Sequence, residues 1–168
     1  MKKTLSITVQ NEPAVLTRIS TVFSSRGFNI DSIAVGPTEQ KGISKIIMIL
    51  PADNQIIEQI TKQLNKLVQV IEIKDITTSP CVERELMLVK VFSSPAVRSE
   101  IVNIVEIFRS KIVDMSDFSI TIKVTGDPGK ITTILNILKP YKIFEIVRTG
   151  KISVERELGI NSEFLRNI

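Results

Sequence analysis

The order in which apolar periodicities follow one another constrains the fold of this chain more than any other feature. Apolar and polar residues alternate over residues 5–10, as in a half-buried strand. Apolar residues then recur at helical spacing from Val15 to Phe23. Continued to residue 76, the pattern predicts strand, helix, strand, strand, helix and strand. This order is the split βαβ unit of ferredoxin-like folds, so we expect an α+β domain.

Turn-forming residues mark the ends of the first predicted helix. Pro13 suits the first turn of a helix, which places Asn11 or Glu12 in the capping position. Gly27 is expected to end the helix, because helices commonly stop at a glycine with a left-handed backbone. Residues 28–30 are expected to open the next strand, with a bulge at the two residues that follow. The other elements predicted in this half are strands over residues 43–50 and 70–76 and a helix introduced by residues 51–53.

The same order of elements returns in the second half of the chain. Residues 77–80 form a short polar segment that ends in proline, and we place a domain boundary there, between residues 1–78 and 79–168. We therefore expect two consecutive ferredoxin-like βαββαβ domains, the second ending in a short tail. The elements predicted after the boundary are a strand over residues 86–92, a helix from residues 93–95, a hairpin over residues 112–124, a helix from Asp127, a strand over residues 143–149 and the tail over residues 151–168.

Two small domains of this kind leave much surface to be covered. Each has fewer than about 90 residues and would bury only a modest fraction of its surface. A ferredoxin-like sheet also has one open face and exposed edges, which proteins cover or pair. We therefore expect a homodimer or a larger complex.

The chain lacks the side chains that most catalytic and metal sites require. It contains no His and a single Cys, Cys81, which excludes Ser-His and Cys-His dyads, imidazole metal ligands and an internal disulfide. Its acidic residues show no spacing typical of metal or acid–base sites. Residues 126–130 follow a strand and open a helix, but they lack the spacing of a phosphate-binding Walker loop. We therefore interpret Asp127 as a helix cap, and we predict neither a catalytic residue nor a metal site.

Charge and hydropathy point away from nucleic acids and membranes. The formal net charge of +4 is spread over both halves, with no basic run longer than Lys2-Lys3, whereas nucleic-acid binders concentrate basic residues. The longest run of Ile, Leu, Val and Met covers residues 46–50, far short of the ~20 residues that a membrane helix needs. The first residues enter a strand pattern at once, so we expect no signal or transit peptide.

The start of the first helix is the candidate binding site. Free backbone N–H groups and the helix dipole suit a carboxylate there. Asn11 adds a side-chain amide, and Asn29 would approach from a partner subunit or a neighbouring strand. An amide both donates and accepts, so it can bind the ammonium and the carboxylate of a free amino acid. The alternative interpretation is that Asn11 is a helix cap and Asn29 a turn residue.

A long, ordered series of short motifs runs along nearly the whole chain. In order, the series comprises residues 4–7, Asn11-Glu12, residues 16–19, Phe23, Arg26-Gly27-Phe28-Asn29-Ile30-Asp31-Ser32, and residues 34–38, 59–68, 82–90, 108–109, 125–130 and 148–151. Taken together, the series resembles the regulatory, or small, subunits of acetolactate synthase, also called acetohydroxyacid synthase. No single motif of the series would be specific.

The resemblance implies that the first domain is an ACT domain, a ferredoxin-like amino-acid sensor. It also implies a chain without a catalytic site that binds the large subunit of acetolactate synthase, which holds thiamine diphosphate, Mg²⁺ and FAD. Such a small subunit raises the activity of its partner and confers feedback inhibition by valine or another branched-chain amino acid. The effector of this family lies between the ACT domains of a homodimer. Carried over by position, one side of the site is formed by Asn11, Ala14, Val15 and Leu16, and the other by Asn29 and Ile30.

One departure from the family pattern falls within this site. Ala14 stands where the family usually has Gly, and Pro13 precedes it. Glycine permits close backbone approach and unusual dihedral angles, whereas alanine adds a methyl group and proline removes one N–H donor. This departure would make the effector pocket tighter, and feedback inhibition would then be weaker or lost.

Two other functions fit the same composition. One is a stand-alone ACT-type sensor that controls a different enzyme or transcription, and the other is an enzyme that uses Lys or carboxylates on a ferredoxin-like scaffold. The abundance of Ile and Lys fits an AT-rich genome. We therefore expect a bacterial cytoplasm, or a plastid stroma with a plastid-encoded chain.

Overall fold

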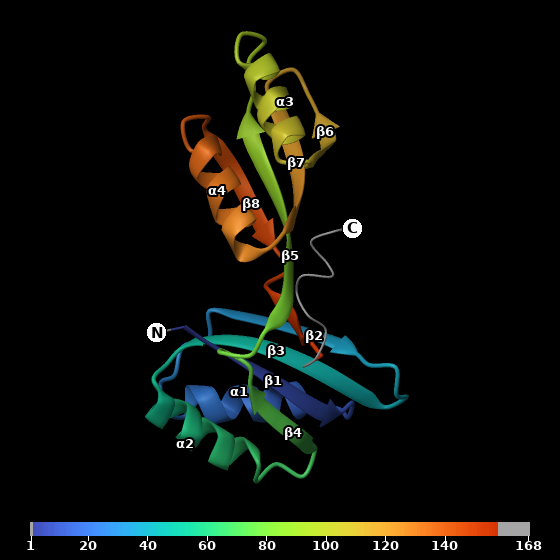
Figure 1. The fold of residues 1–168 in the computed structure, drawn as a ribbon, viewed down its shortest axis with the longest axis vertical. Helices are drawn as coiled ribbons and strands as arrows, with labels where there is room; N and C mark the ends of the chain where they lie inside the picture. Colours follow the sequence, from blue (N-terminus) through green and yellow to red (C-terminus); the bar gives the residue numbers. More distant parts are fainter. Residues whose placement is uncertain (1, 158–168) are drawn as a thin grey trace. The chain divides into compact units, whose positions relative to one another are not determined.

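The computed structural model describes residues 2–157 and divides into two compact units (Figure 1). The end of the predicted tail, residues 158–168, lies outside the described residues. No helix within residues 2–157 is long and apolar enough to cross a membrane. The first unit comprises the residues up to Asp31, Gly36–Val82 and the segment that begins at Ser153, and the second comprises Ser32–Val35 and Glu83–Ile152.

The first unit contains an antiparallel sheet and two helices in the order that the sequence predicts. The elements of this half of the chain are β1 (Lys2–Gln10), α1 (Val15–Ser24), β2 (Ser32–Pro37), β3 (Ile43–Pro51), α2 (Asn54–Leu64) and β4 (Val70–Asp75), and only residues 32–35 of β2 are grouped with the second unit. The strand order in the sheet is β2-β3-β1-β4. The register of β1 with β3 runs without a break from Lys2↔Pro51 to Gln10↔Ile43, and β1 also pairs antiparallel with β4. This topology confirms the ferredoxin-like prediction for the first half.

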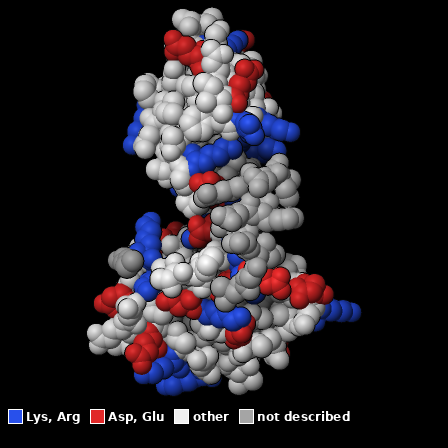
Figure 2. Space-filling model, viewed as in Figure 1, with Lys and Arg blue, Asp and Glu red and all other residues white. Residues whose placement is uncertain are grey.

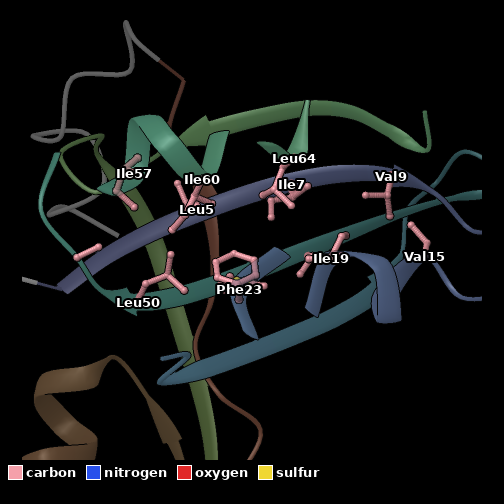
Figure 3. Packing of buried hydrophobic residues seen from close by; sticks show 13 residues of the cluster. Leu5, Ile7, Val9, Val15, Ile19, Phe23, Leu50, Ile57, Ile60 and Leu64 are labelled. Atoms are coloured by element: carbon pink, nitrogen blue, oxygen red, sulfur yellow. The ribbon is translucent and has the colours of Figure 1, made fainter. Parts of the chain in front are cut away.

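The core of the first unit lies between the sheet and its helices (Figure 3). Leu5 and Ile7 of β1 are completely buried, as are Ile19 and Ile60 from the two helices. The apolar residues of each helix recur every three or four positions, so one stripe of the helix faces the sheet. Burying a side chain of this size contributes about 1.5–3 kcal/mol to stability. The periodicity that predicts the helices therefore also assembles the core.

The second unit repeats this arrangement. The elements that follow along the chain are β5 (Cys81–Phe92), α3 (Arg98–Ile107), β6 (Lys111–Met115), β7 (Ser119–Gly126), α4 (Pro128–Leu138), β8 (Ile143–Arg148) and β9 (Ile152–Glu155), of which residues 83–152 belong to the second unit. The strand order is β6-β7-β5-β8, and β9 pairs with β5. Its core combines alternate residues of β5 and β7 with one stripe of each helix: Met87, Val89, Val91, Ile101, Val105, Ile120, Ile122, Val124, Ile131, Ile134 and Leu138. Two βαββαβ units are thus present, as predicted.

Aspartate caps begin two of the helices. The Asp53 carboxylate accepts from the backbone N–H of Ile56 at 2.8 Å, at the start of α2. The Asp127 carboxylate accepts from the backbone N–H of Lys130 at 2.9 Å, at the start of α4. The interpretation of Asp127 as a helix cap is confirmed, and the Lys130 ammonium donates to the nearby carbonyl of Thr125.

Two helices begin later than the sequence patterns suggest. The capping position of α1 is Ala14, so the prediction that Asn11 or Glu12 caps this helix is wrong. α3 begins at Arg98, not at residues 93–95. Residues 95–97 form a turn there, and the Ser94 carbonyl accepts from the backbone N–H groups of Val97 and Arg98.

Two strand boundaries also differ from the predictions. β2 begins at Ser32, whereas Phe28 and Ile30 lie outside any strand and pack against the first core. Their apolar character therefore reflects packing and not strand pairing. β5 begins at Cys81, five residues early, because β9 pairs with it and the backbone N–H of Arg156 donates to the Pro80 carbonyl at 2.8 Å. Nothing local to residues 81–85 indicates this partner.

Candidate functional site

The loop between β1 and α1 is held in place by hydrogen bonds to distant segments. The backbone N–H of Asn11 donates to the Gly42 carbonyl at 2.7 Å. The backbone N–H of Gln10 donates to the Gln69 carbonyl at 2.8 Å, and the Gln69 side-chain amide donates to the Glu12 carboxylate at 3.2 Å. The turn before β3 and the segment before β4 therefore fix both sides of this loop.

The backbone geometry of the loop depends on one residue, Ala14. Its φ of 65° and ψ of 5° place it in the left-handed region, and among the described non-glycine residues only Arg109 shares a positive φ. This conformation costs an L-residue such as alanine roughly 1–2 kcal/mol, whereas glycine adopts it freely. The glycine expected here from the family resemblance therefore has a backbone reason, and the chain tolerates Ala14 at a cost.

The start of α1 carries unused hydrogen-bond donors. Ala14 provides no side-chain cap, and the Glu12 carboxylate is engaged by Gln69. Within residues 2–157, no group accepts from the backbone N–H groups of Leu16 and Thr17. Free N–H groups at a helix start carry partial positive charge and suit a carboxylate or another anion.

The candidate side chains next to this helix start have different environments. Val15 is buried and points toward Val9 in the first core (Figure 3), so only its backbone faces the loop. Leu16 is 41% exposed, and Asn11 and Ala14 are also exposed. The exposed part of the site thus combines one amide, one methyl group and one larger apolar side chain.

The other two candidate residues lie far from the helix start within the same chain. Asn29 is exposed, and Ile30 is half-buried against the first core. Asp31, the next residue, donates its backbone N–H to the Ile49 carbonyl, whereas Asn11 donates to the Gly42 carbonyl. Seven residues of extended chain separate these two acceptors, which corresponds to about 23 Å. One chain therefore does not bring the two halves of the predicted site together.

The described residues do not form a metal site elsewhere in the chain that could replace this loop as the candidate site. No group of three or more His, Cys, Asp or Glu side chains within residues 2–157 could hold a metal ion. Lys, Arg, Asp and Glu are mixed over the face of the molecule that Figure 2 shows, and they do not form one continuous basic field. The loop before α1 is therefore the candidate binding site among the described residues.

Two family models match the chain in succession. Residues 5–72 match the AHAS small subunit-like ACT domain, and residues 84–157 match the family described as the small subunit of acetolactate synthase. A small subunit of acetolactate synthase from Mycolicibacterium smegmatis is 47% identical over 153 residues, covering 91% of this chain and 90% of the relative. The chain belongs to the family of acetolactate synthase small subunits.

Structural similarity extends over both domains of this small-subunit chain. A crystal structure of the acetolactate synthase small subunit from Thermotoga maritima matches it with a TM-score of 0.85 and 37% identity, covering 94% of this chain and 99% of that chain. A chloroplastic small subunit from Arabidopsis thaliana is 43% identical over 163 residues, but the chain spans only 34% of that relative's length. The predicted family and the ACT character of the first domain are both confirmed.

Membership in this family also confirms the prediction that the chain is the small, regulatory subunit of acetolactate synthase. The sequence did not reveal the left-handed backbone at Ala14. The only signal for it was the glycine that the family resemblance places at this position.

Proposed function

We propose that this chain binds the large catalytic subunit of acetolactate synthase, raises its activity and makes it sensitive to valine or another branched-chain amino acid. The observation that carries the proposal is the match of both domains to acetolactate synthase small subunits. A stand-alone ACT sensor would need only the first domain, whereas residues 84–157 match the family model described as the small subunit of acetolactate synthase. The reaction itself then belongs to the large subunit, which holds thiamine diphosphate, Mg²⁺ and FAD.

The proposed effector site is shared by two copies of the chain. One copy contributes Asn11, Ala14, Val15 and Leu16, and a second copy contributes Asn29 and Ile30. The separation of about 23 Å along β3 supports this division, since a single amino acid cannot span it within one chain. A homodimer through the ACT domains with two-fold symmetry would create two equal sites.

Each group in this site has a chemical role toward a free amino acid. The unpaired N–H groups of Leu16 and Thr17 would receive the effector carboxylate. Asn11 and Asn29 would accept from its ammonium or donate to its carboxylate. The exposed Leu16 side chain would contact a branched apolar side chain, whose removal from water contributes about 25 cal/mol per Å². This combination favours valine, leucine or isoleucine over a polar amino acid.

The cellular compartment of the chain is inferred from the compartments of its relatives. Similar small subunits occur in bacteria and in a chloroplast, and we propose a bacterial cytoplasm or a plastid stroma for this chain.

Copurification tests the proposal. The tagged chain is co-expressed with the large subunit of the same source, and we expect the two to purify as one complex. Isothermal calorimetry of the chain with valine, leucine and isoleucine then identifies the effector. A chain that binds an amino acid but never retains the large subunit would instead be a stand-alone sensor.

A further inference from the structure

The second unit has a sheet face that its own helices do not cover. Met87, Val89 and Val91 of β5 are buried in the core with α3 and α4. Side chains alternate along a strand, so Leu88 and Phe92 point to the opposite face of the sheet. Both are 37% exposed. We call the residues on this side the open face.

Strand register arranges the open face into an apolar half and a basic half. Leu88 lies opposite Val147 of β8 on one side and opposite Lys123 of β7 on the other. Lys123 in turn lies opposite Lys111 of β6. A row across the sheet therefore reads Val147, Leu88, Lys123 and Lys111, two apolar side chains followed by two cationic ones.

The apolar half continues along β5 toward its end. The rings of Phe92 and Phe144 contact edge to face, with centroids 6.3 Å apart, and the Lys142 ammonium lies 5.6 Å from the centre of the Phe144 ring. Phe144 is 48% exposed and Val147 is 55% exposed. Aromatic and aliphatic side chains that remain open to water in this way are typical of interaction surfaces.

The basic half places two lysines directly opposite each other, an arrangement that does not stabilise the domain. Like charges directly opposite on neighbouring strands are destabilising, yet Lys111 and Lys123 occupy such a pair. Among the residues that the structure describes, no carboxylate forms an ion pair with either lysine. Lys90 lies on the same face, opposite Glu145, and Asp114 is the acidic residue of β6 on this face. Across the open face, strand register therefore places three lysines, Lys90, Lys111 and Lys123, against two acidic residues.

We propose that the open face docks a surface of the catalytic large subunit that presents carboxylates to Lys111 and Lys123 and an apolar patch to Leu88 and Val147. This inference rests on the proposed function, because it takes the large subunit as the partner. Carboxylates from a partner would neutralise the lysine pair, and the apolar patch would bury side chains that are open to water. A second copy on this face would bring one set of lysines toward the other, and a nucleic-acid backbone would leave the apolar half uncovered.

Lys111→Glu separates a docking role from a structural one. The substitution places a carboxylate opposite Lys123, and an opposite-charge pair stabilises neighbouring strands. We expect the free full-length chain to unfold at a higher temperature, while its affinity for the large subunit falls about tenfold because the carboxylates of the partner are now repelled. A folding defect would instead lower both the unfolding temperature and the affinity for the large subunit.

Lys139→Glu is the matched control, because it makes the same change of charge at the end of α4, on the covered side of the sheet. Affinities of the wild-type chain and both variants for the purified large subunit are measured by surface plasmon resonance. We expect Lys139→Glu to bind like the wild type, and wild-type binding to weaken with added salt. If Lys111→Glu and the wild type bind the large subunit equally well, the open face is not the docking surface, and the proposed function is unaffected.

Two further results would also overturn the inference. If Lys111→Glu changes the sedimentation of the chain alone but not its binding to the large subunit, the open face contacts a second copy. If the wild-type chain does not bind the large subunit at all, the proposed function fails and this inference fails with it.

Discussion

The backbone N–H of Asn11 donates to the carbonyl of Gly42 at 2.7 Å, which ties the loop before α1 to the turn before β3. Ala14 follows three residues later in a left-handed conformation, and α1 then begins without a side-chain cap. The loop is therefore fixed by the backbone, while the Asn11 side chain stays exposed. This geometry leaves the helix start open to a ligand.

Ala14→Gly is expected to stabilise the first domain. The substitution removes the strain of a left-handed alanine, roughly 1–2 kcal/mol, but the more flexible unfolded chain offsets about 0.4–1 kcal/mol of it. A net gain of roughly 0.5–1 kcal/mol in the free energy of unfolding remains. Urea denaturation measures this change.

Ala96 offers a matched control for that prediction. It occupies the corresponding turn before α3, after a proline as Ala14 does, but it is not among the described residues with a positive φ. Ala96→Gly should therefore cost stability, because it only adds freedom to the unfolded chain. Destabilisation of similar size by both substitutions would contradict the role assigned to the Ala14 backbone.

Asn29→Ala is expected to weaken valine binding about tenfold, a typical loss when a bound polar group keeps no partner. Asn29 is exposed and lies outside the strands, so the free energy of unfolding should change by less than about 0.5 kcal/mol. Calorimetry with valine measures the first effect. Asn103→Ala, an exposed position on α3, serves as the control and should leave valine binding unchanged. An unaltered affinity in Asn29→Ala would remove Asn29 from the site.

Mixing two defective variants tests whether the effector site is shared between copies. Asn11→Ala damages one side of each site, and Asn29→Ala damages the other. A mixed dimer carries one site with both changes and one intact site, so random mixing should restore about a quarter of the valine sites of the wild type. Calorimetry of the mixture after subunit exchange gives the number of sites. If mixing restores none while both single variants bind poorly, the two residues act within one chain.

The Asp127 cap predicts how stability depends on pH. The backbone N–H of Lys130 donates to this carboxylate, which lowers the pKa of Asp127 below its usual value. A folded-state pKa below the unfolded one, about 3.9, gives stability that is present above pH 4 and is lost as the pH falls through the folded pKa. Urea denaturation between pH 7 and pH 3 should show this loss.

Asp127→Asn isolates the contribution of the carboxylate. Asparagine caps a helix about as well as aspartate but does not titrate, so the variant should match the wild type near pH 7 within a few tenths of a kcal/mol and decline less steeply in acid. Asp127→Ala should lose about 1 kcal/mol at pH 7. An acid decline as steep in Asp127→Asn as in the wild type would show that other groups control it.

The fold was predictable because its elements carry their own periodicity. Alternation in β1 and the stripe of α1 that contains Ile19 and Phe23 are local patterns that coincide with the buried side of each element. The boundaries that failed depend on distant partners. β5 extends to Cys81 because β9 pairs with it, and Phe28 and Ile30 are apolar because they pack on the core without joining a strand.

The candidate site was less accessible to sequence reasoning. A capping rule applied to Asn11 and Glu12 could not anticipate that Gln69, 57 positions away, engages the Glu12 carboxylate. The left-handed turn at Ala14 has no local signal, since alanine favours a right-handed backbone. The family resemblance supplied the residues proposed for both halves of the site, and the positions of their anchors on Gly42 and Ile49 keep these halves apart within one chain.

The most direct test of a regulatory subunit is the rate of acetolactate formation from pyruvate while this chain is titrated into its purified large subunit. We expect the rate to rise and to saturate at a fixed ratio of the two chains, and the chain alone to form no acetolactate. Valine should then lower the rate of the saturated complex more than that of the large subunit alone. An unchanged rate at every ratio, or full activity from the isolated chain, would contradict this account.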